Sequence, residues 1–264
     1  VARIDIHTEV VNSAKDHRLR VHFPAPFSAE SAQHDGAFEV VSRPLGAAQA
    51  GEKWVELPRP ETHQGAFTTV SNGKIGLTIA NRGLPELEVI PGDSTEIALT
   101  LLRCIGWLSR DDMASRQGHA GPGFETPGAQ MPGQWSFDYA IIPHAGGWQP
   151  ALPLAYAFQA EPRAIETAIH AGEIPARGSF VSAAPAEFVI SAIKAAENGK
   201  GWLVRGYNLM PDAIQVSLRP FRRFTRAAQV NLAEQELAPL DWDPSGSVSV
   251  PAGGHAVISV MFYD

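Results

Sequence analysis

Apolar and polar residues alternate with a period of two in short segments along the whole chain. The first segment places Ile4, Ile6 and Val10 on one side and the charged residues between them on the other. This period is typical of a half-buried β-strand. The same pattern predicts further strands over residues 19–23, 38–41, 66–70, 75–79, 97–104, 135–142, 188–193, 202–207, 214–218, 227–232, 248–250 and 256–262.

Turn sequences separate many of these segments, and helical patterns are scarce. Asn-Gly and Pro-Gly turns such as 71–73, 91–93 and 197–199 are typical of hairpin connections. The best helical candidates, residues 149–158 and 109–115, are short and flanked by proline. We therefore predict an all-β fold built as an antiparallel sandwich, since no helices alternate with the strands.

One long segment, residues 109–133, lacks the alternation and is rich in glycine and proline. Loops of this length in a compact domain are usually functional or disordered. Its polar side chains include Asp111, Asp112, Arg116, His119, Glu125 and Gln130. A second change in composition near 182–185 predicts a boundary between a large domain, residues 1–185, and a small terminal domain, residues 186–264.

Composition and charge exclude several classes of function. The formal net charge of −7 and the absence of any long Lys/Arg-rich run disfavour binding to nucleic acid or to an anionic membrane. The apolar runs are too short to span a bilayer. The single cysteine permits no internal disulfide, which fits a cytoplasmic protein of bacterial type. The chain begins at Val1 rather than methionine, and we expect further sequence upstream.

Candidate catalytic chemistry is sparse. The nine histidines include no His-x-x-x-His pair, and Cys104 lies in an apolar strand where it packs as a small hydrophobic residue. We therefore predict no metal site and no cofactor. The acidic pairs that glycoside hydrolysis would need are available, for example Asp111 with Asp112, but most are expected to be solvated. Trp107, Trp135 and Trp202 are expected in the core, and Trp148 and Trp242 at the surface.

Several ordered segments resemble a known family. Residues 12–21, Asn-Ser-Ala-Lys-Asp-His-Arg-Leu-Arg-Val, with Phe23-Pro24, resemble the strand that opens the large β-domain of bacterial α-mannosidases of glycoside hydrolase family 38. Residues 81–89, 98–103, 106–110, 120–122 and 126–130 follow that family in order, and residues 191–194, 204–208 and 231–234 resemble its C-terminal end. The resemblance spans nearly the whole chain.

The resemblance implies a large β-supersandwich followed by a small β-domain. In that family the zinc ligands and the aspartate nucleophile belong to an α/β barrel and a helical segment that precede these β-domains. The resemblance thus implies that this chain is the non-catalytic C-terminal β portion of a retaining, zinc-dependent enzyme that hydrolyses α-mannosides. Alone it is expected to be inactive, with no catalytic residue and no zinc site of its own.

The resemblance also suggests candidate site residues. A loop of the family's large β-domain approaches the substrate groove, and in this chain the corresponding candidate is the segment 109–133. Arg116, Asp112 and Gln130 are then the expected contacts to sugar hydroxyls, because guanidinium, carboxylate and amide groups bond adjacent hydroxyls in a fixed geometry. The alternative is that these side chains order their own loop or seal the interface with the barrel.

Three functions remain open at this point. The leading one is an accessory region that stabilises the catalytic barrel and shapes its groove, with that barrel and an α-mannoside as partners and a homo-oligomer possible. A stand-alone carbohydrate-binding sandwich would instead bind sugar by itself through exposed tryptophans. A purely structural interaction domain would expose a broad apolar face.

Overall fold

The fold is all-β, as the alternation predicts. The computed structural model describes residues 2–172 and 175–264, and no helix within these ranges is long and apolar enough to cross a membrane. The chain forms two compact units. The first comprises the described residues up to Gly36 together with Val41–Pro162, and the second comprises Ala37–Val40 with the described part of Arg163–Asp264. The boundary expected at residue 185 remains a prediction.

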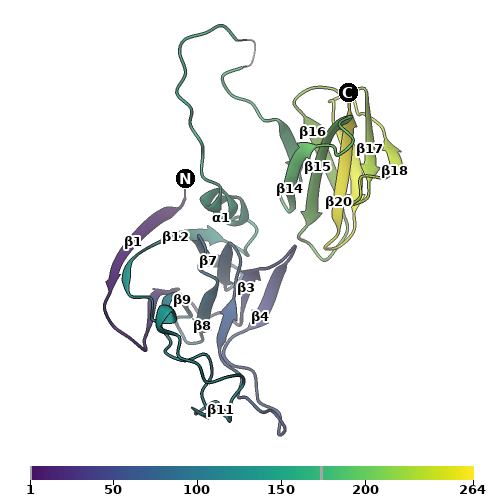
Figure 1. Cartoon of the computed structure of the whole chain (residues 1–264). Coiled ribbons are helices and arrows are strands. Elements are labelled where there is room, and N and C mark those ends of the chain that lie inside the picture. The colour runs from purple at the N-terminus through teal and green to yellow at the C-terminus, as the bar shows by residue number, and fades with distance from the viewer. Residues whose placement is uncertain (1, 173–174) are drawn as a thin grey trace. The chain divides into compact units, whose positions relative to one another are not determined.

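The first unit packs a six-stranded antiparallel sheet against a four-stranded one (Figure 1). The larger sheet has the order β1-β12-β7-β6-β3-β4, and the smaller has the order β2-β9-β8-β5. The strands are β1 (Ile4–Asn12), β2 (Arg18–Pro24), β3 (Ser31–Asp35), β4 (Val40–Pro44), β5 (Glu61–His63), β6 (Phe67–Ser71), β7 (Ile75–Asn81), β8 (Glu86–Ile90), β9 (Glu96–Arg103) and β12 (Gly133–Ala145), with a small hairpin of β10 (Asp112–Met113) and β11 (Arg116–Gln117).

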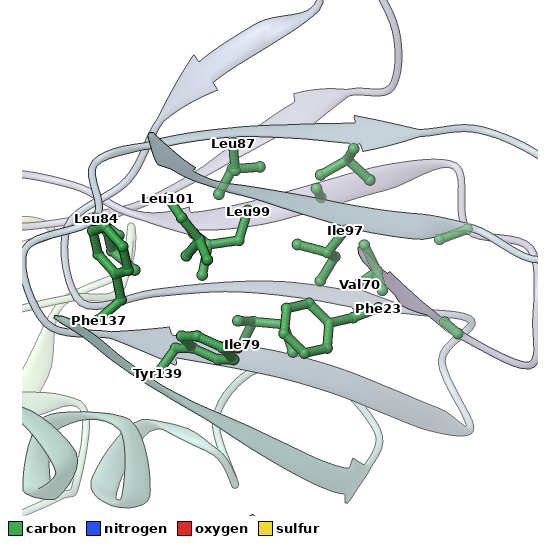
Figure 2. Close-up of a cluster of buried hydrophobic side chains, with 14 of the residues drawn as sticks. Phe23, Val70, Ile79, Leu84, Leu87, Ile97, Leu99, Leu101, Phe137 and Tyr139 are labelled. Carbon is green, nitrogen blue, oxygen red and sulfur yellow. The ribbon is translucent and has the colours of Figure 1, made fainter. Parts of the chain in front are cut away.

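The core of this unit lies between the two sheets (Figure 2). Alternate residues of each strand point inward, so Ile79 of β7 and Tyr139 of β12 meet Leu87 of β8 and Leu99 of β9. Phe23 packs edge-on against Tyr139, with ring centroids 5.7 Å apart. Cys104 is buried in the same core, which confirms its expected role as a small apolar residue.

The outward face of the smaller sheet carries charged side chains that pair with one another over the intervening strands. Arg20 of β2 pairs with Glu88 of β8, and Arg18 pairs with Glu61 of β5. These pairs do not join neighbouring strands, because β9 lies between β2 and β8, and both β9 and β8 lie between β2 and β5. Partly exposed ion pairs of this kind stabilise a fold only modestly. The larger sheet is covered on its outer side by α1 (Leu152–Gln159), which lies within the predicted helical segment 149–158 except for its last residue.

The prediction of a second helix at residues 109–115 is wrong. Asp112–Met113 forms β10 and pairs with Arg116–Gln117 of β11. The segment has no apolar stripe that a helix could bury, and its backbone instead bonds a neighbouring loop, where the N–H of Leu57 donates to the carbonyl of Ser115 (2.8 Å). A 3₁₀ turn, η1 (Pro127–Gln130), closes the same region.

The second unit is a smaller sandwich of three and five antiparallel strands. Its core includes Val204, Leu218, Val250 and Phe262. The sheet orders are β13-β16-β19 and β14-β15-β20-β17-β18. The strands are β13 (Val181–Ala184), β14 (Phe188–Ala195), β15 (Gly201–Asn208), β16 (Ile214–Pro220), β17 (Arg226–Val230), β18 (Glu236–Leu240), β19 (Val248–Ala252) and β20 (Val257–Tyr263).

Candidate functional site

The residues predicted to contact sugar lie in or beside one projection of the first unit, which we call the loop lobe. It consists of residues 51–60 and 104–131 and includes the β10–β11 hairpin (Figure 1). Within residues 104–131 the N–H of Leu108 donates to the carbonyl of Phe124, and the N–H of Thr126 donates to the carbonyl of Gly106. The bond from Leu57 to Ser115 joins this arm to residues 51–60. The lobe therefore has a fixed backbone despite having little regular structure.

Gln130 lies at the base of the loop lobe, where its amide is already bonded. Its Nε2 donates to the Asp16 carboxylate (2.7 Å), and its Oε1 accepts from the Asp16 backbone N–H (2.8 Å). Asn12 joins the same base, because its Nδ2 donates to the carbonyls of Gln130 and Met131. These contacts favour a role for Gln130 in anchoring the lobe.

Arg116 holds the two arms of the loop lobe together. It lies on β11, and its guanidinium donates to the Glu56 carboxylate and to the carbonyl of His119, both at 3.3 Å. Its Nε is buried and has no hydrogen-bond partner among the described residues. Because Arg116 is directly opposite Met113 in the hairpin register, the two share one face of the hairpin.

Asp112 lies on the other face of the hairpin, opposite Gln117. Arg110 binds its carboxylate through both Nε and Nη2, and this pairing lowers the pKa of Asp112 below its ordinary value. Both side chains are more than half exposed. Asp112 is therefore ionised near neutral pH, where its carboxylate accepts hydrogen bonds and donates none.

A hollow of about 310 Å³ opens on the Asp112 side of the hairpin, and we call it the Trp107 hollow. Trp107 is 41% exposed there, next to Asp112 and His119. His119 is 3.8 Å from the Asp111 carboxylate and 3.4 Å from the Ser109 hydroxyl. An aromatic face beside carboxylate, imidazole and guanidinium groups provides both stacking and hydrogen bonding, which are the two interactions that a sugar ring uses.

The structure therefore separates the three predicted side chains. Arg116 and Asp112 lie on opposite faces of one hairpin, and Gln130 is buried at the base of the lobe. Sequence reasoning does not identify Trp107 as a residue of the exposed hollow, because its apolar neighbours in the sequence indicate a core strand. Trp135 is also partly exposed, whereas Trp242 packs against the core of the second unit.

The loop lobe also exposes many large apolar side chains. Trp54 and Val55 are 56% and 71% exposed on one arm, and Phe124 is 65% exposed on the other. The remaining members are Leu57, Ile105, Trp107, Leu108 and Met113. Large exposed apolar surfaces usually mark an interaction site.

Metal-binding side chains do not converge in the part of the chain that the structure describes. Neither residues 2–172 nor residues 175–264 bring together three His, Cys, Asp or Glu side chains in a way that could hold an ion. In the loop lobe one imidazole, His119, lies 3.8 Å from the Asp111 carboxylate, and these two groups alone do not make a zinc site.

Comparison with known proteins relates the chain to one family. A family model described as "Glycosyl hydrolases family 38 C-terminal beta sandwich domain" matches residues 187–259. A curated protein of Halalkalibacterium halodurans, named "Putative mannosylglycerate hydrolase", is 31% identical over 207 residues, which are 78% of this chain and 21% of that protein.

Two solved structures extend the similarity over the whole chain. An alpha-mannosidase from Enterococcus faecalis V583 is 30% identical with a TM-score of 0.79, over 99% of this chain and 27% of that one. A protein in the Glycosyl Hydrolase Family 38 from Enterococcus faecalis is 28% identical with a TM-score of 0.76, over 99% of this chain and 28% of that one. The chain thus spans between about a fifth and somewhat more than a quarter of the length of these proteins.

Proposed function

Because this chain belongs to the C-terminal β-sandwich region of glycoside hydrolase family 38, we propose that it is the non-catalytic part of a longer α-mannoside hydrolase. The similar proteins are about four times as long, and one of them is an alpha-mannosidase. The catalytic region precedes these residues in the longer protein. In this proposal the catalytic region carries the zinc ion and the aspartate nucleophile of a retaining mechanism, as the resemblance to family 38 implies.

The exposed apolar surface of the loop lobe is the observation that carries this proposal. Residues 54–57 and 105–124 contribute eight of the large apolar side chains that remain exposed. Burying those other than Trp107 against the catalytic region removes apolar surface from water, at roughly 25 cal/mol per Å². The lobe then contacts the catalytic region and forms part of the wall of its substrate groove.

Within that groove the two faces of the hairpin have different roles. Asp112 and Trp107 line the exposed hollow and contact the sugar directly. Arg116 is a positioning residue, because it ties Glu56 to the hairpin and fixes where that hollow lies. Gln130 supports the base of the lobe through Asp16.

The inactivity of the isolated region is the first prediction. The 264-residue chain is expected to release no 4-nitrophenol from 4-nitrophenyl α-D-mannopyranoside, with or without added Zn²⁺. The longer protein that contains it is expected to be active. Turnover by the purified chain itself would contradict the proposal.

A second prediction concerns Arg116 in the longer protein. Arg116→Ala is expected to lower kcat/KM about tenfold, because losing the bonds to Glu56 and His119 costs ~1–2 kcal/mol of correct positioning. Arg116→Lys keeps the charge without the two-pronged geometry and should recover only part of the loss. The measurement is kcat and KM separately on a mannoside.

Arg226 provides the matched control for Arg116. It also pairs with a surface glutamate, Glu236, but lies in the second unit. Arg226→Ala should leave kcat/KM within about twofold of the wild-type value, as expected for a surface ion pair. If Arg116→Ala has no larger effect than this control, Arg116 does not position the groove.

The exposed Trp107 favours one alternative function, a sugar-binding module that works without a catalytic region. In that case the isolated chain binds mannosides through the Trp107 hollow, and Trp107→Ala removes the binding. The activity assay on the longer protein separates the two functions.

A further inference from the structure

A second hollow, of about 520 Å³, lies on the opposite side of the β10–β11 hairpin from the Trp107 hollow. We call it the charged hollow. Its lining comes from the outward face of the four-stranded sheet, the turn before β2 and the loop lobe. The lining residues used in the argument are Arg18, Arg59, Arg103, Glu61, Glu86 and Met113.

The carboxylates of the charged hollow are held in place by neighbouring groups. Arg18 bonds Glu61, and its Nε lies 3.7 Å from Glu86. The hydroxyl of Thr100 donates to Glu86 (3.0 Å). These contacts fix the direction of each carboxylate while leaving room for it to accept further bonds, because an ionised carboxylate has about four acceptor positions.

Several hydrogen-bond donors in the hollow are not engaged in these ion pairs. Arg103 comes no nearer to a carboxylate than 3.8 Å, at Glu86, and its side chain is 58% exposed. Arg59 also lines the hollow, and its charge helps to lower the pKa of the Glu61 carboxyl, but among the described residues its guanidinium makes no hydrogen bond and no ion pair within 4 Å. The Nδ1 of His17 is also without a hydrogen-bond partner among those residues. Open guanidinium groups therefore stand beside fixed carboxylates.

The charges of the hollow nearly balance: its lining has three arginines and four carboxylates, and one of those carboxylates, Glu56, pairs with Arg116 outside the lining. The positive groups are Arg18, Arg59, Arg103 and the adjacent Arg116, and the negative groups are Asp16, Glu56, Glu61 and Glu86. A phosphate or carboxylate site would carry an excess of positive charge. Guanidinium donors and carboxylate acceptors in nearly equal number instead suit neutral hydroxyl groups, because each hydroxyl both donates and accepts a hydrogen bond.

We propose that the charged hollow binds a neutral sugar or polyol through adjacent pairs of hydroxyl groups. Arg59 and Arg103 donate to the oxygens, and Glu61 and Glu86 accept from the hydroxyls. Met113 and Ile105 provide apolar contact for the C–H groups of the ligand. The volume lies within the range of about 300–1,000 Å³ that is usual for small-molecule sites.

This inference goes beyond the proposed function and does not depend on it. Binding belongs to the isolated chain, whereas the proposed function concerns catalysis by the longer protein. If the isolated chain were active, the proposed function would be overturned and the inference about the charged hollow would be unaffected. If the isolated chain binds no sugar, the inference about the charged hollow is overturned and the proposed function is unaffected.

The test is a titration of the 264-residue chain with methyl α-D-mannopyranoside and with D-mannitol, followed by NMR chemical shifts. Saturable shifts are expected at residues 17–18, 59–61 and 103–105, with a dissociation constant of roughly a few millimolar, as a few hydrogen bonds in an open site provide. Arg59→Ala and Arg103→Ala are each expected to weaken binding about tenfold.

Arg20→Ala is the matched control, because Arg20 pairs with Glu88 on the same sheet but does not line the hollow. It should change the affinity less than about twofold. Three results would each overturn the inference: no saturable shift with either neutral ligand, binding that survives both arginine substitutions, or binding of sodium phosphate or D-glycerate in place of the neutral ligands. An unchanged Tm confirms that each variant is folded.

Discussion

Replacing Asn208 with alanine is expected to lower the free energy of unfolding of the second unit by about 3 kcal/mol. The Asn208 side chain is fully buried at the end of β15. Its Nδ2 donates to the carbonyls of Asp212 (2.8 Å) and Gly253 (2.9 Å), and its Oδ1 accepts from the N–H of Met210 (2.8 Å). Alanine leaves these backbone groups without partners in a site that excludes water.

Native-state hydrogen exchange in β15 and β20 measures this loss, because it reports on the second unit by itself. Asn198 is the matched control, since it is exposed in a turn and bonds one backbone N–H, that of Lys200. Asn198→Ala should cost no more than about 1 kcal/mol. Equal losses for the two variants would show that the buried bonds of Asn208 do not stabilise this unit.

Buried His34 is expected to make the first unit less stable as the pH falls. Burial, together with the positive charges of Arg43 and His63, lowers the pKa of His34 from 6.5 to about 4. The unfolded chain therefore binds a proton below pH 6.5, and the folded chain binds it only near pH 4. The stability present above pH 6.5 is lost progressively between these values, by at most about 3 kcal/mol.

Asp35 acts in the opposite direction, because burial raises its pKa above 3.8 and its contribution to stability therefore declines as the pH rises. His34→Asn isolates the histidine, since asparagine can keep the bond to the Thr68 hydroxyl (2.8 Å in the wild type) and does not titrate. Unfolding free energies measured between pH 4 and 7 should fall more steeply for the wild type than for this variant. His170→Asn, at an exposed position, should follow the wild type. Parallel curves for wild type and His34→Asn would contradict the prediction.

Strands with a clear alternation could be predicted from sequence. β1 alternates clearly, and its apolar face is less exposed than its charged face, except at Ile4. β7 and β20 are also strands as predicted, but both of their faces are largely buried. β3 gives no such signal, because Ser31–Asp35 is polar. It is a strand because His34 bonds Thr68 of the neighbouring β6 inside the sandwich. Tertiary contacts decide this element, and a single strand cannot reveal them.

The same limit applies to the candidate site. Glycine, proline and polar residues indicate a functional loop over 109–133, and Arg116 and Asp112 do lie on it. The direction of each side chain depends on the register of the β10–β11 hairpin. Strands of two residues have no recognisable pattern, so the separation of Arg116 from Asp112 follows from structure alone. The role of Gln130 depends on Asp16, which is distant in the sequence.

The central claim is that the loop lobe packs against the catalytic region of a longer protein. Amide hydrogen exchange of residues 54–57 and 105–124, measured in the 264-residue chain and in the longer protein, tests it most directly. We predict that exchange in these segments slows at least about tenfold in the longer protein, because docking removes them from water, while β15 and β20 exchange alike in both. Equal rates in the lobe segments would contradict the claim.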